Sequence, residues 1–394
     1  MKWEYKTLDQ LGTVSRGKSK HRPRNDPKLF GGKYPFIQTA DVKNADYYIT
    51  KYSDTYNESG LAQSKLWDKG TLCITIAANI ADTGVLAFPA CFPDSIMGFV
   101  PFEGVANTRF IKYCFDRLQR DCKQISQGTA QDNLSWEKLS TIKFCIPEYK
   151  EQCRIADILS AYDDLIENNQ KQIKLLEEVA QRLYKEWFVD LRFPGHENTK
   201  IVDGVPEGWS KSTVGNICKL RKVVITPDKI ESNTPYIGLE HMPRNDICLS
   251  TWGKSEEINS NKFIYLKKDV LFGKIRPYFH KVGFALNDGI TSTDTMVMVA
   301  DQNLWGLLLV TVSSDAFVDF SYQNCKEGAK MPRADWKQME KYAIMIADQA
   351  TQKLFEQEIL VITNKISALA FQCRSLREAR DRMLPKLMGG EVEA

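Results

Sequence analysis

The chain has 394 residues, of which 43% are hydrophobic and 26% charged, and its formal net charge at pH 7 is +3. This length predicts more than one domain. The start, MKWEYKTLDQ, lacks the apolar run of a signal peptide, and the longest apolar run, Leu304 to Val312, is too short to cross a bilayer. Ten cysteines without a CxxC pair indicate core residues rather than a zinc or disulfide framework. We therefore expect a cytoplasmic protein without a membrane partner or a bound metal.

The first segment, residues 1–147, mixes short strand candidates with a helix candidate. The strands are expected at Leu72–Ala77 and Gly84–Phe88, and the helix at Arg109–Arg120. Turn residues such as Gly31-Gly32 separate such elements. This mixture predicts an α+β domain with a curved sheet.

A basic loop lies near the start of this segment. Gly12–Ser19 fits the GxxxxGK[ST] pattern of a phosphate-binding loop, but the two prolines within Lys20–Pro27 exclude the helix that must follow such a loop. The loop is better interpreted as one that follows DNA phosphates or enters a groove, and a solvated flap is the simpler alternative. Its candidate DNA contacts are Arg16, Lys18, Lys20, Arg22 and Arg24.

Residues 148–190 carry a heptad pattern over about four repeats, without Pro or Gly. The pattern predicts one long helix whose narrow apolar seam needs a partner helix. Trp187 and Phe188 close the stretch; we expect them to contribute to partner docking, and packing on the following domain is the alternative. The seam residues are Leu159, Tyr162, Ile166, Asn169, Ile173, Leu176, Ala180 and Leu183.

A connector and a second mixed segment follow. Residues 191–208, LRFPGHENTKIVDGVPEG, have the Gly, Pro and polar content of a connector. Residues 209–347 again mix strand candidates, Val270–Phe272 and Thr295–Val299, with a helix candidate, Asn303–Ser313. Residues 348–394 then carry a second heptad pattern, which predicts an intramolecular coiled coil with the first. Its seam residues are Ile359, Ile362, Ile366, Leu369, Cys373, Leu376 and Met383.

The two halves repeat at a spacing of about 200 residues. Trp3 corresponds to Trp209, and Tyr34-Pro35-Phe36-Ile37 corresponds to Thr234-Pro235-Tyr236-Ile237. A unit this long is a duplicated domain with its helix rather than a solenoid repeat. The fold class expected is therefore α+β: two mixed domains separated by two long antiparallel helices and related by an approximate two-fold axis.

Further polar candidates lie in the second domain and in the loops ahead of the long helices. Gln can pair with adenine and Arg with guanine through two hydrogen bonds, although ordinary surface polarity explains any single residue equally well. The candidates are Gln127, Thr129 and Gln131 in the first half, and Arg221, Lys222, Lys274, Arg276, Lys330 and Arg333 in the second.

The chain resembles the specificity subunits of type I restriction–modification systems. The resemblance rests on Gly128-Thr-Ala-Gln-Asp-Asn-Leu-Ser-Trp136, on Ile146-Pro-Glu-Tyr-Lys-Glu-Gln152 and on Ile155-Ala-Asp-Ile-Leu159. The second copy departs from the pattern, with Ile346-Ala347 where the family has Ile-Pro. The resemblance spans essentially the whole chain.

This resemblance implies that residues 1–147 and 209–347 are target-recognition domains that each read half of a gapped DNA sequence. The helices would act as a spacer and dock two methyltransferase subunits, which restriction subunits join. The subunit itself would hold no cofactor, whereas its partners would use S-adenosylmethionine, ATP and Mg²⁺.

No catalytic constellation is evident in the sequence. The four His form neither HExxH nor HxH, and GxSxG is absent. A non-catalytic DNA-recognition subunit is therefore the favoured interpretation. A nucleotide-binding enzyme that uses Gly12–Ser19 and a stand-alone DNA-binding scaffold or repressor remain the alternatives.

Overall fold

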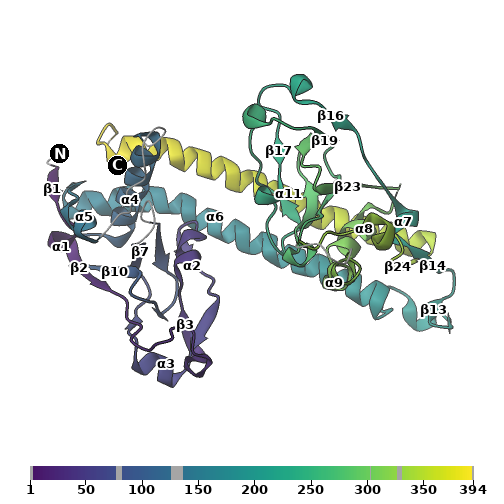
Figure 1. Ribbon diagram of the computed structural model, residues 1–394, viewed down its shortest axis with the longest axis horizontal. Helices are drawn as coiled ribbons and strands as arrows, with labels where there is room; N and C mark the ends of the chain where they lie inside the picture. Colours follow the sequence, from purple (N-terminus) through teal and green to yellow (C-terminus); the bar gives the residue numbers. More distant parts are fainter. Residues whose placement is uncertain (1–2, 77–81, 126–135, 302, 326–330, 393–394) are drawn as a thin grey trace. The chain divides into compact units, whose positions relative to one another are not determined.

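The computed structural model describes residues 3–76, 82–125, 136–301, 303–325 and 331–392 (Figure 1). The chain forms two compact units. Unit 1 comprises Met1–Ile166 and Ser375–Ala394, and unit 2 comprises Glu167–Arg374. Each unit contains one mixed domain and part of both long helices, α6 (Tyr149–Tyr184) and α11 (Gln349–Met388).

Unit 1 is built on a five-stranded sheet of order β2-β10-β7-β8-β4, in which only the β4–β8 pair is parallel. Side chains alternate between its faces, as strand geometry requires. Leu72 and Ile74 pack toward α4, while Cys73 packs on the other side with Trp67. The strands are β2 (Gly12–Arg16), β4 (Tyr48–Ile49), β7 (Leu72–Thr75), β8 (Thr83–Leu86) and β10 (Ile96–Pro101), and α4 spans Thr108–Ile125.

Smaller elements complete unit 1. A four-stranded sheet has the order β5-β3-β9-β6, and β1 pairs with β11. These strands are β1 (Glu4–Lys6), β3 (Phe30–Phe36), β5 (Asp54–Tyr56), β6 (Leu66–Trp67), β9 (Ala90–Cys91) and β11 (Phe144–Ile146). The short helices are α1 (Leu8–Leu11), η1 (Pro27–Leu29), α2 (Thr39–Lys43), α3 (Glu58–Ala62) and α5 (Trp136–Thr141).

Unit 2 repeats this plan. Its five-stranded sheet has the order β15-β23-β20-β21-β18, its four-stranded sheet the order β16-β19-β22-β17, and β14 pairs with β24. The strands are β14 (Ser210–Thr213), β15 (Cys218–Leu220), β16 (Val224–Ile225), β17 (Tyr236–Ile237), β18 (Cys248–Leu249), β19 (Lys262–Tyr265), β20 (Val270–Gly273), β21 (Val282–Ala285), β22 (Gly289–Thr291), β23 (Thr295–Ala300) and β24 (Ala343–Ile346).

The remaining elements of unit 2 are short helices and one hairpin. A π-helical turn, η2 (Lys185–Val189), ends α6, and the hairpin β12 (Ile201–Val202) with β13 (Val205–Pro206) lies in the connector. The other helices are η3 (His196–Asn198), α7 (Val214–Ile217), η4 (Pro227–Lys229), η5 (Leu239–His241), η6 (Ser255–Glu257), η7 (Pro277–Phe279), α8 (Trp305–Val312), α9 (Asp315–Gln323) and α10 (Trp336–Met339).

The small sheets show where the two domains differ. In both, a central strand pairs in parallel with one neighbour and antiparallel with another: β9 with β3 and β6, and β22 with β17 and β19. The fourth strand lies at opposite edges, because β5 extends the sheet beside β3 whereas β16 extends it beside β19. The duplicated frame expected from the sequence is therefore confirmed, and each copy has its own edge strand.

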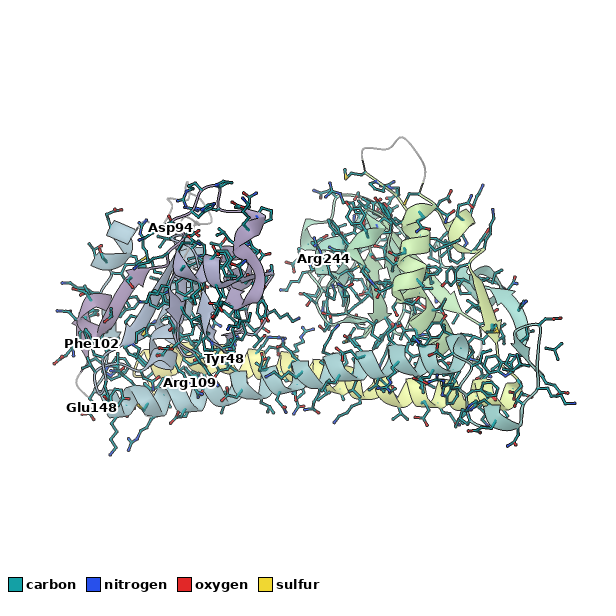
Figure 2. All side chains as sticks on the ribbon, turned by 90° about the horizontal axis from the view of Figure 1, so that it is seen from below. Tyr48, Asp94, Phe102, Arg109, Glu148 and Arg244 are labelled. Atoms are coloured by element: carbon teal, nitrogen blue, oxygen red, sulfur yellow. The ribbon has the colours of Figure 1, made fainter. Side chains whose placement is uncertain are left out.

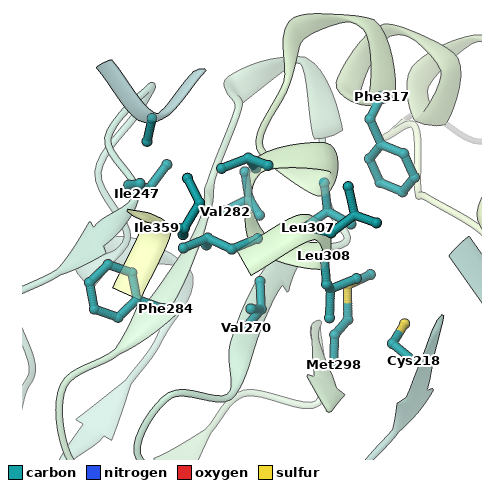
Figure 3. Close-up of a cluster of buried hydrophobic side chains, with 14 of the residues drawn as sticks. Cys218, Ile247, Val270, Val282, Phe284, Met298, Leu307, Leu308, Phe317 and Ile359 are labelled. Atoms are coloured by element: carbon teal, nitrogen blue, oxygen red, sulfur yellow. The ribbon is translucent and has the colours of Figure 1, made fainter. Parts of the chain in front are cut away.

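The main core of unit 2 joins its mixed domain to the long helices. Figure 3 shows Val270 and Val282 of the sheet beside Leu307 and Leu308 of α8, with Ile359 of α11 in the same cluster. All five side chains are at most 1% exposed. Burying apolar surface contributes about 25 cal/mol per Å². The long helix α11 is therefore part of the core of this mixed domain.

The two long helices pair antiparallel, as expected. Within unit 2, the Asn169 amide donates to Gln372 over 3.1 Å, and the Trp187 ring lies 5.5 Å from the Phe355 ring. Partners thus descend along α11 as residue numbers rise along α6. Within unit 1, Leu159 shares a core with Leu384. Every predicted seam residue is buried or half-buried.

The turn expected at Gly31-Gly32 is wrong, because both glycines lie inside β3. The expected helices differ from the structure at their ends. The helix expected at Arg109–Arg120 runs from Thr108 to Ile125, and the one expected at Asn303–Ser313 is α8, Trp305–Val312. Among the described residues, no helix combines the length and apolar character needed to cross a membrane.

Candidate nucleic-acid interface

The basic loop of unit 1 follows β2 and is anchored at several points. The Gly17 amide donates to the Ile96 carbonyl over 2.9 Å, and the Ser64 hydroxyl donates to the Lys18 carbonyl over 2.7 Å. The His21 amide donates to Gln63 Oε1 over 3.0 Å. A backbone held in this way is not the free flap that was the simpler alternative. The candidate side chains that it exposes are Arg16, Lys18, Lys20, Arg22 and Arg24.

The phosphate-loop alternative is wrong for this segment. Gly12–Arg16 is a strand paired with β10, and no helix begins between residues 17 and 26. At Gly17 an added Cβ would collide with the carbonyl oxygens of Phe92 and Pro93. The space that a phosphate would need beside this glycine is filled by the protein's own backbone.

The basic loop has a neighbour that sequence reasoning missed, Lys65. Its ammonium lies 3.5 Å from the centre of the Trp67 ring. Burial and the positive charge of Lys18 lower the pKa of Lys65. A phosphate would relieve this repulsion between two cations. The only sequence signal for Lys65 is its position beside a tryptophan.

Two of the five candidates in this loop already have partners. Arg24 forms an ion pair of 2.7 Å with Asp94, which is labelled in Figure 2. The Arg22 guanidinium donates to the carbonyl oxygens of Ser19 and His21. These arginines therefore stabilise the loop as well as adding charge to it.

In unit 2 three distant parts of the chain bring basic residues together. Residue Ile275 forms a β-bridge with Arg333, and the Lys274 ammonium donates to the Thr293 carbonyl over 2.6 Å. Burial lowers the pKa of Lys274, and the positive charges of Arg333 and Lys222 act in the same direction. Lys222, Lys274 and Arg333 form what we call the basic cluster.

Asp294 compensates the basic cluster only in part. It forms an ion pair of 2.7 Å with Arg333 and opposes the fall in the pKa of Lys274. Asp294 therefore acts on two cations of the cluster, Arg333 and Lys274, while Lys222 adds a third positive charge beside Lys274. Such an excess of positive charge beside a sheet edge can bind a polyanion.

The remaining candidates differ in their surroundings. Arg221 donates to both carboxylate oxygens of Asp269, over 2.9 and 3.3 Å, inside the domain. Arg276 begins the turn η7 and is half-buried. Gln127, Thr129, Gln131 and Lys330 lie outside the described residues.

Each mixed domain is also attached to the long helix from the other half of the chain. In unit 2, Glu177 of α6 accepts hydrogen bonds from the Ile247 and Cys248 amides over 2.8 and 3.2 Å. In unit 1, Arg377 of α11 forms an ion pair of 2.7 Å with Asp46. In each domain the attachment lies next to the same strand of the repeat, β4 or β18. Each domain therefore contacts the long helix of the other half of the chain as well as the long helix of its own half.

Unit 1 adds contacts to α6 as well. Tyr48 donates to Asp164 over 2.9 Å, and Arg109 donates to Ser160 over 2.7 Å; Figure 2 labels Tyr48 and Arg109 near this helix. These polar bonds fix the domain on its helix through directional contacts.

The expectation that Trp187 and Phe188 are available for partner docking is wrong. Their exposed fractions are 7% and 5%. Phe188 packs on Trp209 and Phe355, with ring centres 5.2 and 4.8 Å apart. Both rings pack in the apolar core of unit 2. This is the alternative that the sequence left open.

Among the described residues, no group of three or more His, Cys, Asp or Glu could hold a metal ion. Nine of the ten cysteines have described side chains and these are free, and burial raises the pKa of several of them, including Cys91.

Residues 1–178 match the family described as "Type I restriction modification DNA specificity domain". The MjaIX specificity subunit of Methanocaldococcus jannaschii is 25% identical over 99% of this chain and 93% of its own length. The chain is thus similar to type I specificity subunits along nearly its whole length. The EcoDI specificity subunit of Escherichia coli is 20% identical over 86% of this chain and 76% of its own.

A solved structure shares the fold of this chain. The type I S subunit of M. genitalium aligns with a TM-score of 0.57, at 16% identity, over 98% of this chain and 96% of its own. The resemblance found in the sequence is therefore confirmed, and it extends from the short motifs to the whole architecture.

Proposed function

We propose that this chain is a type I specificity subunit that recognises a gapped DNA sequence, and that each of its two mixed domains is a recognition domain that reads one half of it. The observation that carries the proposal is the duplicated frame with unlike edges. The two domains share their five-stranded order but place β5 and β16 at opposite edges of their small sheets. The shared strand order would let both domains approach DNA in the same way. The different edge strands, β5 and β16, would let each domain select different bases.

Both domains carry basic residues next to their small sheets, ahead of β6 in the first domain and ahead of β16 in the second. The first has its anchored loop with Lys18, and the second has the basic cluster. Contacts to phosphates supply affinity and register, and contacts to base edges supply sequence discrimination. Specific binding should therefore weaken steeply as salt is added.

The paired helices are proposed to set the distance between the half-sites. The seam residues are not all alike, because polar side chains such as Asn169 and Arg380 interrupt the apolar ones. Only one register of the two helices therefore pairs these side chains correctly. Half-sites read from one face of the duplex lie about one helical turn, or about 10 bp, apart from centre to centre.

The chemistry is proposed to belong to the partners. Two methyltransferase subunits would dock on the helices and each would receive one adenine, flipped out of the duplex. They would use S-adenosylmethionine, and restriction subunits would use ATP and Mg²⁺. The specificity subunit would be non-catalytic and would act in the cytoplasm, where the DNA lies.

Purification of the complex from cells that carry this gene and its neighbours tests the proposal. We expect methyltransferase to co-purify and to be required for binding one gapped duplex over a duplex with either half scrambled. Specific binding by the chain without methyltransferase would instead support the stand-alone scaffold. Turnover of ATP or GTP by the isolated chain would contradict a non-catalytic role.

A further inference from the structure

An unusual turn in the second recognition domain carries an exposed tyrosine. The turn η7 lies between Arg276 and His280, which both have a φ of +51°. Residues other than glycine rarely adopt this left-handed region. Such backbone conformations persist where surrounding contacts hold them, often at functional sites.

The turn is held at both ends. The Arg276 amide donates to the Pro332 carbonyl over 2.8 Å, and the Asn245 amide donates to the His280 carbonyl over 3.1 Å. His280 also donates from Nε2 to the Ser313 carbonyl over 2.9 Å. The loop is therefore rigid, and its projecting side chain has a defined position.

Tyr278 projects from this turn as part of an exposed aromatic pair. Tyr278 and Tyr322 are each 45% exposed, and their rings meet edge to face with centres 5.2 Å apart. The neighbouring Phe279 supports Tyr278 at 4.9 Å. Exposed aromatic rings held in fixed positions suit contact with nucleobases, which all offer an apolar face.

Two guanidinium groups lie over the Phe279 ring, which packs against Tyr278. Arg244, labelled in Figure 2, lies with its guanidinium carbon 3.9 Å from the centre of the Phe279 ring, and that of Arg276 lies 5.7 Å from it. The Arg244 side chain is exposed while it packs on this ring. Arginines stacked on a ring keep their N–H groups available for phosphate.

The geometry points to a DNA contact made by Tyr278, Arg244 and Arg276, in addition to the basic cluster. The Tyr278 ring packs on a nucleobase of the second half-site, and the two guanidinium groups bind the phosphates beside it. Arg276 connects this contact to the basic cluster, because residue Ile275 pairs with Arg333. The inference rests on the proposed function and assigns residues to it.

The test uses the complex purified with its partners and a labelled duplex that contains the gapped target sequence. Tyr278→Ala should weaken binding by at least about fivefold, the lower range for loss of a stacked aromatic. Tyr278→Phe keeps the ring and should bind like the wild type. Arg244→Ala should reduce the slope of log affinity against log salt by about 0.9, which corresponds to one phosphate contact.

Tyr52→Ala is the matched control. Tyr52 is also 45% exposed and packs edge to face on an aromatic ring, Phe88, at 5.3 Å. It should bind DNA like the wild type, and thermal unfolding should show that every variant is folded. A Tyr278→Ala effect no larger than that of Tyr52→Ala would overturn the inference.

Different results would contradict the proposed function and the Tyr278 contact. If the wild-type complex does not distinguish the gapped duplex from a scrambled one, the proposed function fails. If the wild type discriminates while Tyr278→Ala and Arg244→Ala retain its affinity and salt slope, only this inference fails.

Discussion

Asp163 of α6 and Arg380 of α11 form a buried ion pair within unit 1, where their side chains are 1% and 17% exposed. The Tyr113 hydroxyl donates to the same carboxylate over 2.5 Å. Arg380 occupies the position that the repeat assigns to Ala180, so this pair explains why the two seams differ. The two helices meet through matched polar groups as well as through apolar ones.

Removing Arg380 should be costly because it leaves a buried carboxylate without its cation. We expect Arg380→Met to lower the free energy of unfolding by about 3 kcal/mol. Adding Asp163→Asn should recover part of the loss, since the amide is neutral and still accepts from Tyr113. Urea unfolding of the two single variants and the double variant measures the coupling; strictly additive losses would contradict a direct pair.

Asn169 supplies a second polar contact between the helices, in unit 2. It is 2% exposed, and buried asparagines in coiled-coil seams fix register at a cost in stability. Asn169→Leu should therefore leave the melting temperature equal or higher, whereas Asn169→Asp, which buries a charge, should lower it. Thermal unfolding followed by circular dichroism distinguishes the pair, and a lower melting temperature for the leucine variant would count against a role in register.

Glu177 should make stability depend on pH. Burial and the negative charge of Asp246 raise its pKa to about 7, against an ordinary value of 4.5, although Lys174 and two backbone amides oppose the shift. A raised carboxyl pKa means that the stability contribution is complete below pH 4.5 and is lost as the pH rises through 7.

Glu177→Gln cannot ionise and should lack this loss. Relative to wild type, the variant should gain roughly 2 kcal/mol of unfolding free energy between pH 5 and pH 8. Urea titrations at the two pH values measure the difference. Parallel behaviour of the two proteins would show that Glu177 keeps an ordinary pKa in the folded state.

The basic cluster should contribute charge to DNA binding. Lys222→Ala should weaken binding to all duplexes similarly and reduce the salt slope by about 0.9, because a phosphate contact carries no sequence information. Fluorescence anisotropy at several salt concentrations measures the slope. Lys200→Ala, an exposed lysine of the connector, is the control and should leave the slope unchanged.

The sequence predicted the long helices and the duplication because heptads and repeat spacing are local, countable patterns. It could not predict the Asp163–Arg380 pair, which joins residues 217 positions apart. It also missed the opposite edge strands, since β16 is only two residues long and has no period to detect. The Tyr278 turn escaped notice for a related reason, because a left-handed φ at Arg276 leaves no mark in residue type.

For the candidate site, too, local patterns could be predicted from the sequence and contacts between distant residues could not. Basic residues in one loop, such as Lys18 and Arg24, could be named from their spacing. The meeting of Lys222, Lys274 and Arg333 depends on sheet order, and the sequence named these residues without showing that they lie together. Trp187 and Phe188 misled for the opposite reason: large aromatic rings at a helix end fit a docking surface and a core equally well.

Mapping methylated adenines in DNA from cells that carry this gene and its neighbours tests the central claim most directly. The account predicts one gapped motif with a methylated adenine in each half, lost when the gene is deleted. Exchanging residues 209–347 for those of a relative should change one half of the motif and leave the other intact. A continuous motif, or a motif that survives deletion, would contradict recognition by two separate domains.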